Sequence, residues 1–330
     1  MPPTLRDVAR KAGVSIKTVS RVVNGQGEIS DSTRRRVQET IAELDYRPSK
    51  LARALVTQRT ETVGLVLGDI TNPFFPEVAR GVLDTAEAQG YNVFVCNTDG
   101  DPSREIRILR SLTDHAVDGI IIFPTFELEC ALPEFARLSH PVVTVNRAFD
   151  CPGVSNVMMQ SRRGAKLAVE HLIRQGHRAI GMAAGLSPTV HHLQRVQGYC
   201  AALAEHGLPV VEDWIVPGPP VEKHGREAAR ALLLQHPEIS ALFAYNDLLA
   251  LGALKAGQEL GRRVPQDLAV VGFDDIPLAD RVSPARTTVR VNKYDLGCRA
   301  TRQLIQMLNQ PGEPCPPLWL DVELVVRASA

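Results

Sequence analysis

The stretch TLRDVARKAGVSIKTVSRVVNG, residues 4 to 25, predicts two short helices joined by a tight turn. Thr4 followed by Asp7 resembles a capping box, which marks the start of the first helix. Gly13 can adopt the positive φ that ends this helix, and Ser15 can cap the second. Apolar residues recur at helical spacing in both segments: Val8, Ala9 and Ala12, then Val19, Val22 and Val23.

A third helix is predicted over 31–44, so residues 1–46 form a helix-turn-helix unit. In such a unit the start of the second helix can meet base edges in a major groove of DNA. Its expected outer face carries Ser15, Ile16, Lys17, Ser20 and Arg21. Lys17 and Arg21 lie four residues apart, so either could pair with guanine or hold a phosphate. The alternative is a solvated amphipathic helix pair without a DNA-binding role.

The charge distribution favours the DNA-binding interpretation. The 330 residues carry a formal net charge of zero, but residues 1–60 hold 12 Lys and Arg against 6 Asp and Glu. Residues 61–330 hold 25 against 31. A basic module appended to a mildly acidic body is typical of a polyanion-binding unit.

Residues 47–60 read as a junction containing a short helix. Pro48 disfavours helix at Arg47, and the segment KLARAL at 50–55 is too short to be stable alone in water. Lys50 and Arg53 are available for phosphates, and Leu55 lies on the apolar side with Leu51. A plain linker helix with a buried leucine is the alternative.

From residue 61 onward, apolar strand runs alternate with amphipathic helices in two successive series. The predicted strands are 62–70, 92–98, 119–124 and 141–146, then 178–185, 214–218, 241–246 and 268–275. Helices are predicted at 73–89, 103–114, 161–175, 192–206, 223–235 and 247–260. This pattern predicts two α/β lobes, each a doubly wound parallel sheet covered on both faces. Lobe 1 is assigned to about 61–160 plus 292–325, and lobe 2 to about 161–291.

Polar side chains follow the predicted strands where ligands bind in doubly wound sheets. They are Asp69, Asn146, Arg147, Asn246 and Asp274, with Phe74 or Phe75 suited to the apolar face of a sugar. The set suits a polyhydroxylated or carboxylated small molecule. For each single residue a helix cap or loop hydrogen bond is an equal alternative, above all for Asp247. No dinucleotide-binding or phosphate-loop glycine motif follows a strand, and no metal-ligand spacing occurs among Cys and His, so no cofactor or metal is expected.

Both parts of the chain resemble the LacI/GalR family of bacterial transcription regulators. The matching strings are the opening stretch, YRPSKLARAL at 46–55, ITNPFF, VNR at 145–147, QRVQGY at 194–199, FAYND and VVGFDD. The resemblance implies a periplasmic-binding-protein-like core, a hinge helix in which Leu55 kinks operator DNA, and an effector cleft between the lobes. The DNA contacts that it implies are Thr4, Ser15, Ile16, Lys17, Thr18, Ser20, Arg21, Asn24, Lys50, Arg53 and Leu55. The implied effector contacts are Phe74, Asn146, Arg147, Arg195, Asn246 and Asp274, and Asp69 joins them as a strand-end residue.

Two departures from the family pattern prevent the transfer of a particular effector. Asn146 replaces the common Asp of an Asp-Arg pair, and Val291 stands where many members carry Gln. The effector is therefore expected to be a sugar, a sugar acid or a sugar phosphate without further choice among them.

The function expected from the sequence is a ligand-responsive repressor that binds a pseudo-palindromic operator on double-stranded DNA as a homodimer. A cytoplasmic location is expected, because residues 1–20 are charged and lack the apolar run of a signal peptide, and a DNA-binding function makes it nucleoid-associated. No membrane partner is expected, because no stretch approaches ~18 apolar residues. A cytoplasmic sugar-binding protein without a regulatory role is the alternative. An enzyme is not expected, because no nucleophile and base stand together.

Overall fold

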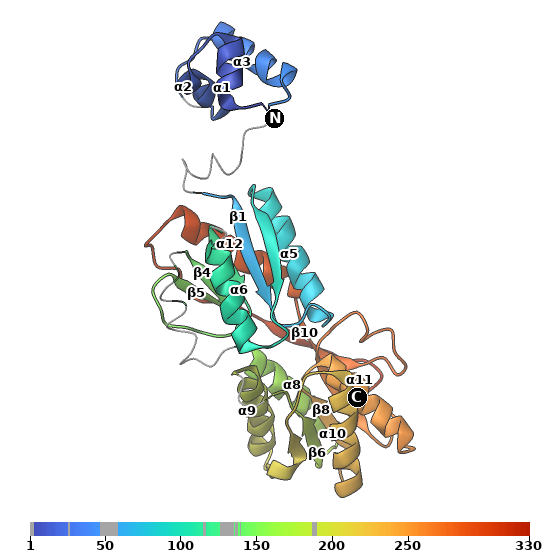
Figure 1. Ribbon diagram of the computed structural model, residues 1–330. Helices are drawn as coiled ribbons and strands as arrows, with labels where there is room; N and C mark the ends of the chain where they lie inside the picture. The colour runs from blue at the N-terminus through green and yellow to red at the C-terminus, as the bar shows by residue number, and fades with distance from the viewer. Residues whose placement is uncertain are drawn as a thin grey trace. The chain divides into compact units, whose positions relative to one another are not determined.

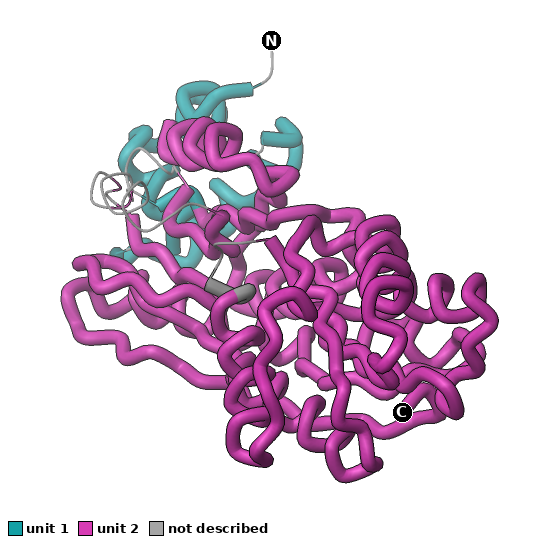
Figure 2. The backbone as a smooth tube through the Cα atoms, turned by 90° about the horizontal axis from the view of Figure 1, so that it is seen from below, with its two compact units in different colours: residues 1–60 teal, residues 61–330 magenta. Residues whose placement is uncertain are grey.

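The structure is a computed structural model that describes residues 3–25, 27–46, 59–114, 117–125, 135, 138, 140–186 and 190–330. The chain divides into two compact units, residues 1–60 and 61–330 (Figures 1 and 2). The predicted hinge residues Lys50, Arg53 and Leu55 lie outside the described residues. None of the described helices is long and apolar enough to cross a membrane.

The first unit contains the three expected helices: α1 (Leu5–Ala12), α2 (Ile16–Val23) and α3 (Asp31–Glu43). Asp7 accepts hydrogen bonds from the Thr4 backbone N–H and hydroxyl at 3.0 and 2.7 Å, and Gly13 ends α1 with a φ of +62°. Ser15 caps α2 by accepting from the Thr18 backbone N–H at 3.1 Å. The apolar residues that the spacing selected form one core, built around fully buried Val8, Val19 and Val37.

The first lobe of the second unit is built on the sheet β11-β5-β4-β3-β1-β2. Its strands are β1 (Thr62–Leu67), β2 (Asn92–Asn97), β3 (Gly119–Ile122), β4 (Val142–Val145), β5 (Val154–Met159) and β11 (Leu318–Leu320), all parallel. Helices α5 (Phe74–Ala88) and α12 (Lys293–Asn309) lie against each other (Figure 1). They approach closely because Gly81 and Gly297 each lack a Cβ that would stand 2.2 Å from a backbone oxygen of the other helix. Helix α6 (Pro102–Asp114) joins a separate apolar cluster with β1 and β3.

The second lobe is built on the sheet β12-β10-β9-β8-β6-β7. Its strands are β6 (Ile180–Ala183), β7 (Ile215–Val216), β8 (Ala241–Ala244), β9 (Ala269–Asp274), β10 (Thr287–Val291) and β12 (Val322–Val325). Helices α8 (Ser161–Arg174) and α9 (Val190–Glu205) pack together, and so do α10 (Glu222–Gln235) and α11 (Asp247–Glu259), while residues 212–214 form a short 3-10 helix. Strand β12 alone is antiparallel to its neighbour within the described part of this sheet.

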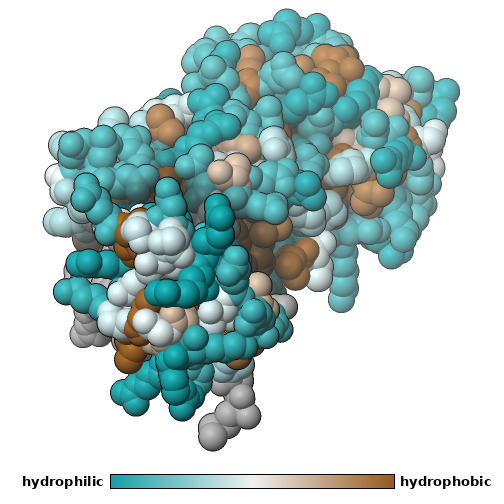
Figure 3. All heavy atoms as spheres, turned by 90° about the horizontal axis from the view of Figure 1, so that it is seen from above, coloured by the Kyte–Doolittle hydropathy of each residue, from teal (hydrophilic) through white to brown (hydrophobic). Residues whose placement is uncertain are grey.

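The path of the last strands corrects the predicted lobe boundary. Residues 292–325 were assigned to lobe 1, and this holds for α12 and β11. Strand β12 instead pairs with β10 in the second sheet, with Val322 facing Val291. The chain thus passes between the lobes at Gln160, Asn292 and Asp321. The space-filling view shows a largely hydrophilic surface with small, separate hydrophobic groups (Figure 3).

Candidate functional site

The outward face of α2 presents the residues predicted to read DNA. Lys17 and Arg21 are exposed, and Ile16, an apolar side chain, is 46% exposed at the first position of the helix. An exposed isoleucine makes no hydrogen bonds with water, but it can make an apolar contact with the methyl group of thymine. The two cationic side chains can bind guanine or phosphate. The face therefore has one apolar and two cationic groups for a polyanionic, base-bearing surface.

The polar residues of the same predicted set are engaged within the headpiece. Thr4 and Ser15 take part in the caps described above, and the Thr18 hydroxyl lies 2.8 Å from the Ser15 hydroxyl. The Asn24 side chain donates to the Ser20 hydroxyl at 3.3 Å. The Thr4 bonds fix the start of α1, and the others fix the start and end of α2, so these residues orient the outward face whatever contacts they make with DNA.

In the second lobe, Arg195 from α9 and Asp274 at the end of β9 are brought together. Arg195 Nη2 donates to Asp274 Oδ1 at 3.1 Å, and both side chains are buried. The guanidinium lies 3.6 Å from the centroid of the Phe273 ring and 4.4 Å from that of Tyr245. It also donates to the Tyr245 carbonyl oxygen. Burial raises the pKa of Asp274, while the Arg195 and Lys293 charges act to lower it.

Asn246 and Asp247 stand at the start of α11. The sequence makes Asp247 above all a candidate helix cap and Asn246 a candidate effector contact. Asn246 caps the helix by accepting from the Leu249 N–H at 2.9 Å, and it donates to the Pro220 carbonyl at 3.2 Å. Asp247 is fully buried, accepts from the Thr288 hydroxyl at 2.8 Å and lies 3.4 Å from the Arg286 guanidinium. Burial raises the pKa of Asp247 to about 6. Asp247 is thus the anchor of a buried ion pair, and Asn246 is the helix cap.

In the first lobe, the predicted residues stand at the carboxyl ends of β1 and β4. Asp69 is half-buried and accepts from the Thr71 N–H and hydroxyl at 2.9 and 2.6 Å. Phe74, at the start of α5, is 6% exposed and packs edge-on against two neighbouring phenylalanines, Phe75 and Phe123. The aromatic group provides an apolar wall beside the strand ends.

Asn146 and Arg147 follow β4 and are both buried. Asn146 adopts a φ of +61°, and its Oδ1 accepts from the Met159 N–H at 3.3 Å, which ties the end of β4 to β5. The Arg147 guanidinium lies 5.4 Å from the centroid of the Phe149 ring. Its charge acts to lower the pKa of Glu105, but burial dominates and raises that pKa to about 7. Asn is one of the few non-glycine residue types that adopt this left-handed backbone readily, so the residue type fits the turn after β4.

Lys293 is a site residue that the sequence analysis did not identify. Its buried ammonium donates to the carbonyl oxygens of Asp274 and Asp275 at 2.9 and 2.7 Å, at the end of β9 in lobe 2. It also lies 3.6 Å from the Glu77 carboxylate on α5 in lobe 1. The lysine therefore connects the two lobes beside Asp274. Nothing in its local sequence, Asn-Lys-Tyr, marks this position, because all its partners are distant in the chain.

The geometry defines a class of protein with two kinds of site: a helix-turn-helix headpiece and a two-lobed core with polar groups at its strand ends. Residues 4–49 match the family described as bacterial regulatory proteins, lacI family. Residues 60–315 match the family described as periplasmic binding proteins and sugar binding domain of LacI family.

Relatives and solved structures agree with this class. The ribose operon repressor of Halalkalibacterium halodurans is 38% identical over 98% of this chain and 96% of its own length. The structure of the lac repressor dimer bound to operator and the anti-inducer ONPF aligns with a TM-score of 0.88 at 27% identity, over 100% of this chain and 99% of that chain. The complex of the regulator CelR with cellobiose aligns with a TM-score of 0.76 at 32% identity, over 99% of this chain and 100% of that chain.

The chain is a DNA-binding transcriptional regulator rather than an enzyme. It belongs to the LacI family. The resemblance noted from the sequence is thereby confirmed, as is the fold of a helical headpiece joined to a two-lobed α/β core.

Proposed function

We propose that this chain is a homodimeric repressor of carbohydrate or sugar-acid utilisation genes, and that a small molecule bound between its lobes controls its affinity for an operator. The observation that carries the proposal is the exposed face of α2, where Ile16, Lys17 and Arg21 point away from the headpiece core. Two such heads related by a two-fold axis would read a pseudo-palindromic site.

The effector site of the proposal is the set of strand ends in the two lobes. Arg195 and Asp274 offer a charged pair, Asn146 and Asn246 offer amides, and Phe74 belongs to an apolar wall. Amides, charges and an aromatic face together suit a polyhydroxylated ring, and Asp69 and Arg147 extend the polar set. The names of similar proteins include a ribose operon repressor and a cellobiose complex, which favours a sugar or sugar derivative here.

The dimer of the proposal has a suitable surface in the first lobe. Strand β2 is the edge strand of its sheet, and Phe94 and Val95 on it are 47% and 40% exposed. Leu83 on the adjoining α5 is also exposed. An apolar, unpaired strand edge is a site where a second copy of the chain can pack. The hinge segment, with Lys50, Arg53 and Leu55, would then order on the operator and transmit the state of the lobes. Such a protein would act at the nucleoid in the cytoplasm.

Selection of bound fragments from the genomic DNA of the source organism tests the proposal. The fragments retained by the full-length chain at fixed salt should share one pseudo-palindromic sequence, and the same protein should sediment as a dimer. Fragments with no shared sequence, or a monomer that binds them equally well, would contradict it.

A further inference from the structure

A pocket of about 500 Å³ lies at the lobe junction, apart from the strand-end residues described above. It is lined by Gln160 and by residues of α8 and α9 from lobe 2, while Trp319 on β11 contributes from lobe 1. None of the seven predicted effector contacts is among its lining residues. On α9, the pocket uses Gln194, Gln197, Ala201 and Glu205, whereas Arg195 and Tyr199 of the same helix are buried. The pocket is therefore a separate site.

The pocket is cationic. Arg162, Arg163 and Lys166 line it, and Glu205 is the single acidic residue among its lining. Lys166 neutralises Glu205 at 2.5 Å, and this contact lowers the pKa of the carboxyl group. Arg163 donates to Asp321 at 3.0 Å, but Arg162 makes no ion pair with any residue of the described chain. One exposed guanidinium thus remains for a ligand.

Unsatisfied polar atoms inside the pocket point to an anionic ligand. Ser161, the first residue of α8, is fully buried, and its hydroxyl has no hydrogen-bond partner in the described part of the molecule. The buried Oε1 atom of Gln194 also has no partner among the described residues, and this acceptor suits a hydroxyl group of a ligand rather than its phosphate. The side chain of Gln160, the N-cap residue of α8, makes no hydrogen bond to the first N–H groups of this helix. A buried hydroxyl at the start of a helix, next in sequence to an exposed guanidinium, suits phosphate oxygens.

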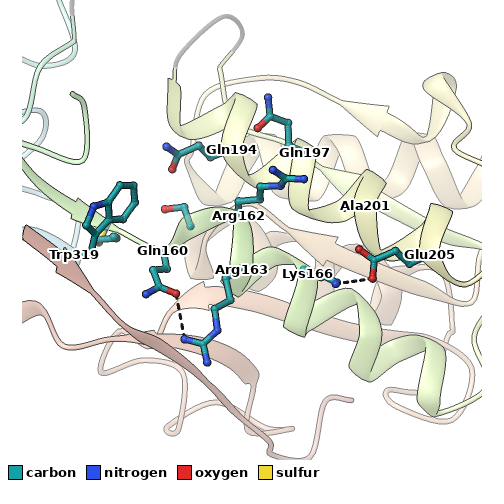
Figure 4. Close-up of a pocket in the computed structure, with 11 residues that line it drawn as sticks. Gln160, Arg162, Arg163, Lys166, Gln194, Gln197, Ala201, Glu205 and Trp319 are labelled. Atoms are coloured by element: carbon teal, nitrogen blue, oxygen red, sulfur yellow. Dashed lines mark hydrogen bonds and ion pairs between the residues drawn. The ribbon is translucent and has the colours of Figure 1, made fainter. Parts of the chain in front are cut away.

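Trp319 adds a flat apolar surface to this cationic site. The side chain is 55% exposed, and Figure 4 shows it at one end of the pocket, with Gln194 and Gln160 on either side and the Lys166–Glu205 pair at the opposite end. An indole face stacks on sugar or base rings. The pocket therefore offers an anion site and a ring-stacking site within a volume suited to a small metabolite.

We infer that this pocket binds a small phosphomonoester that carries a ring, with the phosphate at Ser161 and Arg162 and the ring on Trp319. Because Trp319 belongs to lobe 1 and the phosphate site to lobe 2, the ligand contacts both lobes at once. Gln160 and Arg163 also bond to Asp321, at another crossing between the lobes, at 2.7 and 3.0 Å. The ligand accordingly favours one arrangement of the lobes, which makes it a second effector linked to the strand-end site.

Isothermal titration of the full-length protein with ribose 5-phosphate, adenosine monophosphate, ribose and inorganic phosphate tests the inference. Ribose 5-phosphate or adenosine monophosphate, the two ring phosphates, should bind saturably. Inorganic phosphate and ribose should bind the same site with at least tenfold lower affinity. Arg162→Gln and Ser161→Ala should each weaken binding by about tenfold, the scale of one lost charge-assisted hydrogen bond. Trp319→Leu should weaken the ring phosphate but leave inorganic phosphate unchanged.

Arg230→Gln, which removes an exposed arginine on α10, is the matched control and should leave binding unchanged. Absence of saturable binding, or binding that survives both pocket variants, would overturn the inference. The titration involves no DNA, so its failure is distinct from failure of the proposed repressor function.

Discussion

The Arg195 guanidinium donates to the Asp274 carboxylate at 3.1 Å while it stacks on the ring of Phe273, the residue just before Asp274. Both charged side chains are almost fully buried. A buried pair of this kind is costly to break from one side, because the remaining charge loses its partner without regaining water. The pair therefore couples the stability of the second lobe to the chemistry of the proposed effector site.

Asp274→Asn should lower the free energy of unfolding by about 3 kcal/mol, because it leaves the Arg195 charge buried without its counter-ion. Asn tolerates the left-handed backbone, with its φ of 103°, so the loss measures the charge rather than strain. Urea denaturation measures the change, with the exposed Asp280→Asn as the control. Equal stability of Asp274→Asn and the parent chain would contradict the importance assigned to the pair.

Lys17→Ala should reduce discrimination between operator and scrambled DNA by roughly 10- to 100-fold, the scale of one side chain that contacts a base. The Lys17 side chain is exposed at the second position of α2, so its removal should not affect folding of the headpiece. Fluorescence anisotropy with both DNAs at one salt concentration gives the ratio, and Lys223→Ala on α10 serves as the control. A uniform loss on both DNAs, with a smaller salt dependence, would instead assign Lys17 to a phosphate.

Leu55→Ala should weaken operator binding and spare binding to scrambled DNA. The resemblance to the LacI/GalR family assigns this leucine to the kink of the operator, and a kink is needed only in the specific complex. Residue 55 lies outside the described residues, so the prediction rests on the sequence. The two affinities, measured side by side, decide it: a similar loss on both DNAs would indicate a plain linker helix.

Glu105 should make the folded protein less stable as the pH rises from about 4.5 to about 7. Burial raises the pKa of this carboxyl group to about 7, so the folded state holds a proton that the unfolded chain has already lost in this window. The raised pKa of Glu105 lowers the free energy of unfolding by at most about 3 kcal/mol, and the full loss is reached above pH 7. Asp247, whose pKa is raised to about 6, contributes in the same direction.

The contribution of Glu105 to the pH dependence of stability is measured by comparing Glu105→Gln with the parent chain. Glu105→Gln should be more stable than the parent chain at pH 8 and of similar stability at pH 4, because the parent carboxyl group is neutral there. Glu87→Gln, an exposed residue on α5, should follow the parent chain at both pH values. Parallel stability–pH curves for Glu105→Gln and the parent would count against the raised pKa.

The headpiece was the most predictable part of the chain, because its signals are local. Caps at Thr4 and Ser15, the turn at Gly13 and apolar residues three and four apart define helices within a few residues of their observed ends. In the core, strands with continuous apolar runs, such as β3 and β9, were predicted for the same reason. Strands β5 and β10 and helix α12 were not predicted, since β5 mixes Ser and Asn with its apolar residues and β10 contains Arg290.

The candidate site was predicted as a set of positions but not as a set of partners. Position at a strand end is a local property, and it selected Arg147, Asn246 and Asp274 from the sequence. The Arg195–Asp274 and Asp247–Arg286 pairs and the contacts of Lys293 join residues between 18 and 216 positions apart. Such pairing is fixed only when the sheet is assembled. The same limit explains β12, whose sheet depends on where the chain crosses between lobes.

The central claim is that the exposed face of α2 reads an operator and that a ligand in the core controls this. The most direct test is fluorescence anisotropy of the purified protein on the DNA upstream of its own gene, against scrambled DNA at one fixed salt concentration, with sugars, sugar acids and sugar phosphates then added. We predict a preference of ~10³-fold or more for the upstream DNA, changed by at least one compound. Equal, salt-sensitive binding to both DNAs that no compound alters would contradict the claim.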